Sequence, residues 1–292
     1  MAGPLSIAVK SYPHTAFLTD PAFTAGGRPV SVDAADPIYR AFAPMVRELR
    51  YDVSELAIAT FLQAHEAGAP IALLPVVLSG DFHHHSLTRW PGSPEIAPGD
   101  LAGRRIGVRA YSQTTGLWVR GILQEEYGLD AKDVTWVTTE EPHVAEYVEP
   151  PNVERTTGKL LEVLRRGDVS AAVLGPPALD SAEGPLVPII PDWRAAEEAW
   201  GVRHGTVPIN HMLTVRRDLL EREPQVVTDL YQAFGTRIEE RKAAEDGPRV
   251  RALRFGVTDE LVAGLQVAID YALQQNVIRT PVTVAELLGD FA

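Results

Sequence analysis

The chain has 292 residues, enough for two compact domains or one large one, and its 45% hydrophobic and 23% charged content is ordinary for a globular protein. A formal net charge of −12 argues against nucleic acid as a partner, because binding to phosphates needs clustered Lys and Arg. The absence of cysteine excludes disulfides, thiolate metal sites and cysteine nucleophiles.

The N-terminal segment indicates neither export nor insertion into a membrane. Residues 1–9 lack the basic start and the apolar run of a signal peptide, and no later run approaches the length that spans a bilayer. We therefore expect a cytoplasmic protein with no membrane partner. Residues 5–9 form a short apolar pattern typical of a strand, and the polar residues 10–15 end it, as at the start of an open α/β sheet.

Residues 36–86 predict two helices and a buried strand. Asp36 followed by proline favours a helix start, and Asp52 with Glu55 has the spacing of a capping box for a helix through His65. Residues 71–78 are continuously apolar and predict a buried strand. The histidine triplet, residues 83–85, follows this strand.

The stretch from residue 103 to 151 has the clearest pattern in the chain. It predicts a strand over 105–108, a polar loop over 109–116, a helix that stops at Gly128, and a second strand. The loop places hydroxyl and amide side chains where a helix leaves its first backbone N–H groups unpaired. Such a terminus can hold a carboxylate or phosphate, although Ser and Thr are also favoured there as plain caps.

After residue 151 the sequence predicts one more alternation of helix and strand, and then mainly helices. Helical patterns cover 158–166, 227–238 and 261–273, strand-like patterns cover 171–174 and 206–215, and Thr283 with Glu286 caps a last short helix. Polar clusters follow the predicted strands that end at residues 9, 78, 108 and 174. Ligands of open α/β sheets gather at the carboxyl ends of strands, so we expect one shared cleft.

The central run TTGLWVRGILQEEYG, residues 114–128, resembles the corresponding stretch of the 4,5-dihydroxyphthalate decarboxylase family. The similarity continues over residues 134–137, 143–147 and 150–153, and also covers 51–55, 82–84 and 208–211. The resemblance implies an α/β, two-lobed type 2 periplasmic-binding-protein-like fold with a ligand cleft between the lobes. Residues 1–104 and 211–292 would form lobe one and residues 105–210 lobe two, with crossovers near Arg105 and Asn210.

The resemblance also implies a reaction: cofactor-independent removal of one carboxylate from 4,5-dihydroxyphthalate, giving protocatechuate and CO2. One carboxylate must be held, a base must take the proton of the hydroxyl para to the departing carboxylate, and an acid must protonate the ring carbon. His14 stands where family members carry an arginine. We expect catalytic roles for His83, His84, His211, Asp52 and Glu55, and substrate binding by His14, Ser54, Tyr111, Ser112, Gln113, Thr114, Thr115 and Asn210.

Two alternatives remain open from the residues. His83 and His85 share one face of an extended segment and could bind a divalent ion, but a lining or proton-transfer role is favoured, so we expect no metal and no organic cofactor. The expected partner is a small aromatic carboxylate, with a homo-oligomer left open. A non-catalytic solute-binding protein for such a ligand, or a different small-ring enzyme, would use the same scaffold.

Overall fold

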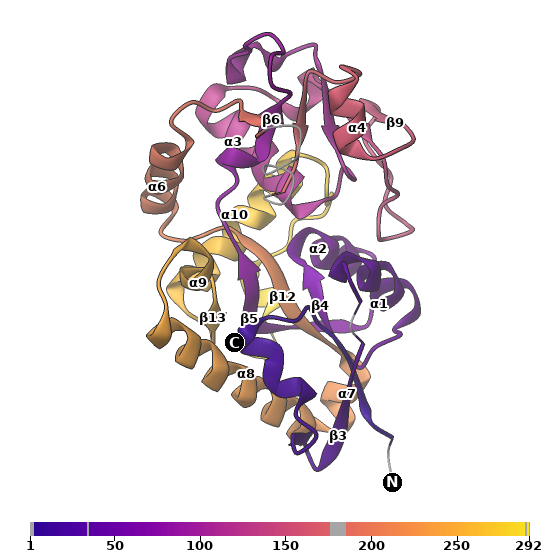
Figure 1. Cartoon of the computed structure of the whole chain (residues 1–292). Coiled ribbons are helices and arrows are strands. Elements are labelled where there is room, and N and C mark those ends of the chain that lie inside the picture. The colour runs from indigo at the N-terminus through magenta and orange to yellow at the C-terminus, as the bar shows by residue number, and fades with distance from the viewer. Residues whose placement is uncertain (1–2, 34, 176–184, 290, 292) are drawn as a thin grey trace.

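The computed structural model describes residues 3–33, 35–175, 185–289 and 291. In this part of the chain the strands form two separate sheets, which lie one above the other in Figure 1 with helices around each. Pro176 and Pro177, which follow the strand expected at 171–174, lie outside the described residues. Among the helices described, none combines the length and the apolar character that crossing a bilayer requires.

The first sheet has the order β13-β5-β12-β4-β1-β3-β2. Its strands are β1 (Leu5–Ala8), β2 (Thr24–Ala25), β3 (Arg28–Asp33), β4 (Val53–Ala57), β5 (Ile71–Gly80), β12 (Ile209–Arg216) and β13 (Arg254–Phe255). Strand β1 is parallel to β3 and β4, whereas β12 runs antiparallel to both β4 and β5. The carboxyl ends of β1, β4 and β5 therefore lie at the same edge as the amino end of β12.

The second sheet has the order β11-β6-β10-β7-β8-β9. Its strands are β6 (Leu87–Arg89), β7 (Arg105–Val108), β8 (Thr135–Thr138), β9 (Val153–Arg155), β10 (Ala171–Val173) and β11 (Val187–Pro188). The four strands β10, β7, β8 and β9 are mutually parallel along the sheet, and β6 joins antiparallel to β10. Thr115 and Gly175, which come after the carboxyl ends of β7 and β10, line the cleft described below together with residues of the first sheet's loops.

The chain changes sheets between β5 and β6 and returns between β11 and β12. The first change falls between residues 80 and 87, so β6 pairs within the second sheet although it precedes Arg105. The return falls between residues 188 and 209, close to the crossover expected near Asn210. The lobe boundaries at residues 104 and 210 stay predictions, and the strand pairing favours an earlier first boundary.

Helices cover both sheets. Around the first sheet are η1 (Pro13–Thr19), η2 (Ile38–Ala41), α1 (Phe42–Glu48), α2 (Ile58–Glu66), α7 (Arg217–Arg222), α8 (Pro224–Ala244), α9 (Pro248–Arg251), α10 (Asp259–Gln274) and α11 (Val284–Leu287). Around the second are η3 (His84–Ser86), η4 (Pro98–Leu101), α3 (Thr114–Tyr127), η5 (Ala131–Asp133), α4 (Leu160–Arg165) and α6 (Trp193–His204). The caps expected at Gly128, which is left-handed with φ 68°, and at Thr283 are confirmed.

One hydrophobic core runs through the joint between the two sheets. Helix α10 packs against α2, α3 and α6, and the indole N–H of Trp118 on α3 donates to the carbonyl oxygen of Ile209 on β12 at 3.0 Å. Just past α10, the Gln275 side chain accepts from Arg120 at 2.7 Å and donates to the Leu117 carbonyl oxygen at 2.9 Å. Both side chains of α3 involved here, Trp118 and Arg120, are buried. The sheets are thus joined by packing as well as by the crossing chain.

The capping box expected at Asp52 and Glu55 is wrong. Residues 53–57 are strand β4, fully buried between β1 and β12, and helix α2 begins only at Ile58. The spacing of two carboxylates three residues apart does not distinguish a helix start from a strand. Burial between two strands distant in sequence decides the structure here, because tertiary packing outweighs local preference.

Candidate functional site

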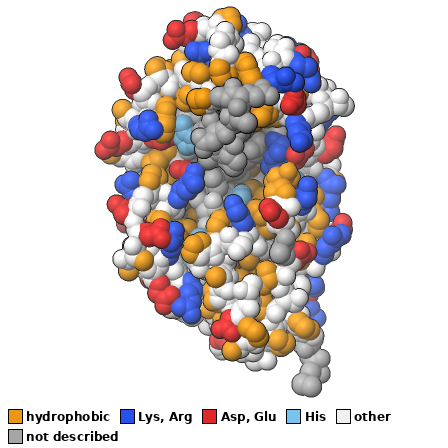
Figure 2. Space-filling view, viewed as in Figure 1, with side chains coloured by type: hydrophobic (Ala, Val, Ile, Leu, Met, Phe, Trp, Pro, Cys, Tyr) orange, Lys and Arg blue, Asp and Glu red, His pale blue; other side chains and the backbone are white. Residues whose placement is uncertain are grey.

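A cleft lies between the two sheets and contains two adjoining cavities. The first, of about 650 Å³, is called the Lys10 cavity, and the second, of about 290 Å³, the Arg109 cavity. Thr115 of α3 and Asn210 of β12 line both, so the cavities meet at these two residues. Figure 2 shows histidine and Lys or Arg side chains gathered around the middle of this face of the molecule.

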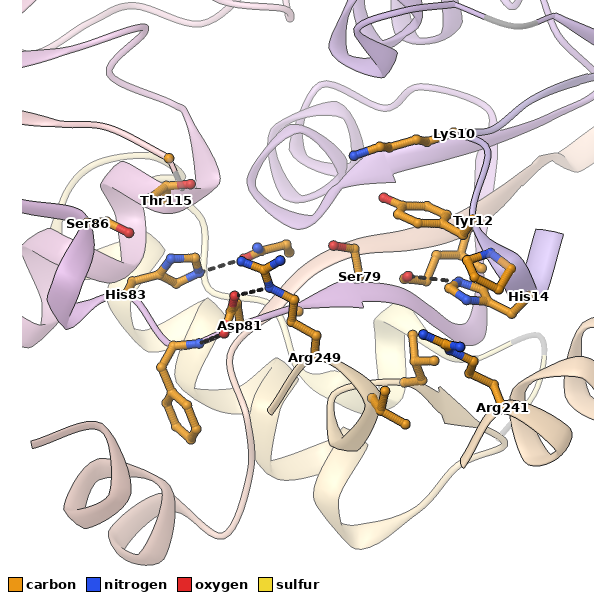
Figure 3. A pocket seen from close by; sticks show the side chains of 18 of the residues that line it. Lys10, Tyr12, His14, Ser79, Asp81, His83, Ser86, Thr115, Arg241 and Arg249 are labelled. Carbon is orange, nitrogen blue, oxygen red and sulfur yellow. Dashed lines mark hydrogen bonds and ion pairs between the residues drawn. The ribbon is translucent and has the colours of Figure 1, made fainter. Parts of the chain in front are cut away.

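The Lys10 cavity is built from strand ends of the first sheet and loops of the second. His83, Ser86 and Thr115 lie on one side of it, and Lys10 and Tyr12 lie opposite (Figure 3). Tyr12 follows β1 and His83 follows β5, whose carboxyl ends lie at one edge of their sheet because these strands run in the same direction. The gathering of polar side chains at strand ends is therefore as expected from the sequence.

Glu55 is the most completely buried carboxylate of the site, with 0% of its surface exposed. It accepts hydrogen bonds from the backbone N–H of Lys10 at 2.9 Å, from the Tyr12 hydroxyl at 2.9 Å and from Nδ1 of His211 at 2.5 Å. Burial alone would raise the pKa of Glu55, but the donors, His211 above all, outweigh it and hold that pKa below its usual value. Burial and the neighbouring Glu55 raise the pKa of Tyr12, which remains a phenol.

His211 lines the Arg109 cavity. Because Glu55 accepts from Nδ1, Nε2 is the nitrogen left to exchange a proton with a ligand. The Phe42 ring packs nearly perpendicular to the imidazole with the centroids 5.3 Å apart. A histidine fixed by a buried carboxylate in this way is suited to acid–base work.

His83 is held by Asn210, one of the two residues that line both cavities. Its Nε2 lies 2.7 Å from Oδ1 of Asn210, and the two form one of the dashed contacts in Figure 3. Burial lowers the pKa of His83 from 6.5 to about 4, so the ring is neutral near pH 7. His83 therefore lines the Lys10 cavity as a neutral, hydrogen-bonded group.

The amino end of α3 forms part of both cavities. Gln113 is the N-cap residue and accepts the first helical hydrogen bond from Leu117 at 2.9 Å, so the N–H groups of residues 114–116 precede the helical ladder. Ser112, Gln113, Thr114 and Thr115 all line the Arg109 cavity. The side-chain oxygen Oε1 of Gln113 is buried with no partner in the described part of the chain. This helix end offers donors and partial positive charge to an anion.

Four cations that the sequence analysis did not select also line the cleft. Lys10, Arg241 and Arg249 border the Lys10 cavity, and Arg109 borders the smaller one. Arg249 pairs with Asp81 at 2.6 Å, and Arg109 pairs with Glu140 at 2.6 Å. Lys10 and Arg109 come within two residues of the ends of β1 and β7, so their positions at strand ends carried a signal, whereas α8 and α9 bring in the other two from the helical tail.

Besides Glu55, which contacts the cleft only through Tyr12 and His211, four residues selected from the sequence lie outside the cavities. Asp52 binds Ser6 at the opposite end of β4, Ser54 donates to the carbonyl oxygen of residue 55, and the Tyr111 hydroxyl donates to Gln275. The buried His84 has Nε2 3.3 Å from the Glu126 carboxylate of α3. Their contacts are structural, and the proposals below do not include them.

His14 lines the Lys10 cavity but does not offer a donor to a carboxylate. Its Nε2 lies 3.1 Å from the Leu78 carbonyl oxygen, so this nitrogen carries the proton. Burial lowers the pKa of His14, and the ring stacks on Tyr12 with centroids 4.9 Å apart. The neutral ring leaves Nδ1 as an acceptor with no partner among the described residues. His14 is thus suited to accept from a hydroxyl.

The histidine triplet does not converge on one point. His83 contacts Asn210, His84 lies against Glu126, and His85 contacts Glu197 of α6. Within the described ranges no group of three or more His, Asp or Glu side chains could hold a metal ion.

The buried histidines predict that stability falls in mild acid. Burial lowers the pKa of His83 and of His143 from 6.5 to about 4, with Arg109 and Arg47 adding to the effect at His143. Between pH 6.5 and 4 the unfolded chain therefore binds protons that the folded protein does not. Each group would lower the free energy of unfolding by up to about 1.4 kcal/mol per pH unit. Urea titrations at pH 7 and pH 5 should show this loss, and His143→Gln should reduce it; an equal loss in the variant would contradict the assignment.

No family model matches the chain. It is 30% identical over 254 residues to 4,5-dihydroxyphthalate decarboxylase from Comamonas testosteroni, covering 79% of this chain and 73% of that protein. It is 32% identical over 196 residues to the protein of that name from Pseudomonas putida, covering 63% and 71%. The periplasmic aliphatic sulphonate binding protein SsuA from Escherichia coli superposes with a TM-score of 0.61 over 98% of this chain and 92% of that chain, at 14% identity. The expected two-lobed binding-protein-like fold is confirmed.

Proposed function

The chain belongs to the 4,5-dihydroxyphthalate decarboxylase family, and on that basis we propose that it is a carboxy-lyase acting on a hydroxylated aromatic dicarboxylate. The proposed reaction converts 4,5-dihydroxyphthalate to protocatechuate and CO2 without an organic cofactor. The observation that carries the proposal is the Glu55–His211 pair, a buried carboxylate that fixes a histidine at the wall of the cleft.

The chemistry assigns a role to each part of the cleft. Each hydroxyl of this substrate is para to one carboxylate, so removal of a phenolic proton raises electron density at the carbon that loses CO2. His211 with Glu55 takes that proton in the Arg109 cavity, where the Arg109 guanidinium can stabilise the phenolate. The retained carboxylate lies toward Lys10 and the amino end of α3, beyond Thr115. The ring itself accepts the electrons, so no cofactor is needed.

The test is direct turnover with the purified protein. Incubation with 4,5-dihydroxyphthalate, with and without EDTA, should give protocatechuate in both samples by chromatography. Phthalate is the matched control ligand: it keeps both carboxylates but lacks the hydroxyl whose deprotonation drives the reaction, so it should bind without turnover. Product lost only with EDTA would overturn the metal-free mechanism.

The solute-binding alternative is supported by the likeness to SsuA, since the fold serves binding as well as catalysis. It predicts a raised melting temperature with 4,5-dihydroxyphthalate but no product. Neither turnover nor binding would contradict both functions.

Lys10 is expected to contribute to substrate affinity. Its ammonium lies 5.3 Å from the centroid of the Tyr12 ring and has no ion-pair partner among the described residues, so it is available to a carboxylate. Lys10→Met should raise KM by about 10- to 100-fold, because a hydrogen bond to a charged group contributes about 1.5–3 kcal/mol, while kcat changes less. Lys132→Met, an exposed lysine that lines neither cavity, is the control, and an unchanged KM in Lys10→Met would contradict this role.

A further inference from the structure

A second histidine–carboxylate pair stands at the Lys10 cavity. His85, in η3, lies with Nδ1 2.6 Å from Oε1 of Glu197 on α6, and its backbone N–H lies 3.4 Å from the same oxygen. Both residues are buried, each with 8% of its surface exposed, and the Trp193 ring packs against the imidazole at 5.1 Å. His85 is part of the cavity lining.

The pair fixes which nitrogen of His85 can react. The Glu197 carboxylate accepts from Nδ1–H, so Nε2 is the nitrogen left to exchange a proton with a ligand in the cavity that His85 lines. The carboxylate also stabilises the imidazolium that an acid needs in its charged state. The arrangement repeats the Glu55–His211 pair, which serves the other cavity.

The other histidines around the Lys10 cavity lack this combination of a carboxylate bound to Nδ1 and an Nε2 left to exchange a proton. His83 gives its Nε2 to Asn210 and is neutral near pH 7, and His14 gives its Nε2 to the Leu78 carbonyl oxygen. His84 faces α3 rather than the cavity. Among the histidines of this cavity, His85 is the one with a carboxylate behind it.

We propose that His85 is the acid of the decarboxylation, donating the proton from Nε2 to the ring carbon that loses its carboxylate, with Glu197 as its positioning residue. This rests on the proposed function. A new C–H bond forms as the proton is transferred, the C–C bond to the carboxylate breaks, and its electron pair returns to the ring as CO2 leaves. Neutral His85 then regains a proton from solvent, so each turnover consumes one proton. His211 returns the phenolic proton, so the two pairs act on opposite ends of one ring.

The charge environment of His85 comes from several elements. Glu197 of α6 contacts it directly, and the neighbouring titratable or charged groups on its own segment and on the helices packed against it are Asp81, His83, His84, Glu126 of α3, Arg203 of α6 and Arg249 of α9. Arg249 is paired with Asp81, and Arg203 with Glu126. The carboxylate of Glu197 is thus the charge in direct contact with the imidazole.

The first test separates proton donation from substrate binding. His85→Gln should lower kcat by about 10²- to 10⁴-fold, with the Kd for 4,5-dihydroxyphthalate within threefold of the wild type by calorimetry. By microscopic reversibility, the wild type in D2O that contains dissolved CO2 should also exchange the C6 hydrogen of protocatechuate, because CO2 adds to C6, the proton returns to His85, and renewed decarboxylation delivers a deuteron. The exchange is seen as loss of the C6 proton NMR signal, and His85→Gln should not show it. His204→Gln, a histidine paired with Glu125 and outside both cavities, is the matched control and should behave as wild type.

The second test uses Glu197→Gln, which keeps the shape and an acceptor oxygen but removes the charge. An acid must be protonated to act, so activity falls as pH rises, and loss of the carboxylate should move that alkaline limb of kcat to lower pH. A wild type without turnover would overturn the proposed function. A wild type that turns over, with His85→Gln retaining kcat within threefold or Glu197→Gln leaving the pH profile unmoved, would overturn this inference alone.

Discussion

Replacing Glu55 with Gln is expected to lower kcat by about 10²- to 10⁴-fold, because the amide cannot stabilise a protonated His211. The carboxylate is fully buried and receives hydrogen bonds from the Lys10 N–H, the Tyr12 hydroxyl and His211, so no water replaces its charge. Initial rates of protocatechuate formation measure the effect, and the melting temperature shows whether the fold is retained. The fall should be in kcat rather than in KM, because Glu55 itself lines neither cavity.

Asp52→Asn is the matched control for Glu55→Gln. Both carboxylates belong to one short segment, but Asp52 binds Ser6 at 2.9 Å and lies 3.7 Å from Arg216, away from the cleft. Asp52→Asn should keep kcat within about twofold and affect only stability, since partly exposed ion pairs contribute about 0–1 kcal/mol. Equal losses of kcat in the two variants would show that the segment matters for folding rather than for chemistry.

Gly121→Ala is expected to destabilise the protein by about 1–3 kcal/mol or more, the usual cost of overpacking a core. Gly121 lies on α3, and a Cβ atom there would stand 1.9 Å from Cδ2 of the Tyr271 ring on α10. The ring is buried and cannot move freely, so the helices must separate. Urea denaturation followed by fluorescence measures the loss in the free energy of unfolding.

A double-mutant cycle identifies the cause. Tyr271→Ala makes room for the added methyl group, so Gly121→Ala should cost much less in the Tyr271→Ala background than alone. Gly99→Ala is the control, because a Cβ there meets nothing within 4 Å, and its effect should stay within about 0.5 kcal/mol. Strict additivity of the two substitutions would rule out the clash.

The helices and strands that depend on contacts within a few residues of the chain could be predicted from the sequence. The strand over residues 105–108, the helix that ends at Gly128 and the capping box at Thr283 all depend on contacts within a few residues, and each is confirmed. Most of strand β4 was assigned to a helix, because its strand partners, β1 and β12, are respectively about 46 and 160 residues away in the chain. Local spacing carries no information on such pairing.

The site could be predicted in part for the same reason. The positions of strand ends brought His83 and the amino end of α3 to the cleft, and the family resemblance brought Asn210 and His211 there; all of them line the cavities. Neither could tell which ring of a histidine triplet faces the cavity, since that depends on Glu126 and on Glu197. Arg241 and Arg249 enter through helix packing, which leaves no local pattern in the sequence.

The attachment of α3 to the end of α10 bears on how substrate is admitted. Beyond the two crossings of the chain between the sheets, Gln275 and the Val277 carbonyl oxygen bind α3 and α2 at the same time, and the indole of Trp118 binds β12. This third connection resists wide opening of the two lobes. The cleft is then largely preorganised, so closing it consumes little of the binding free energy. That free energy remains available to offset the cost of removing water from the substrate's two carboxylates.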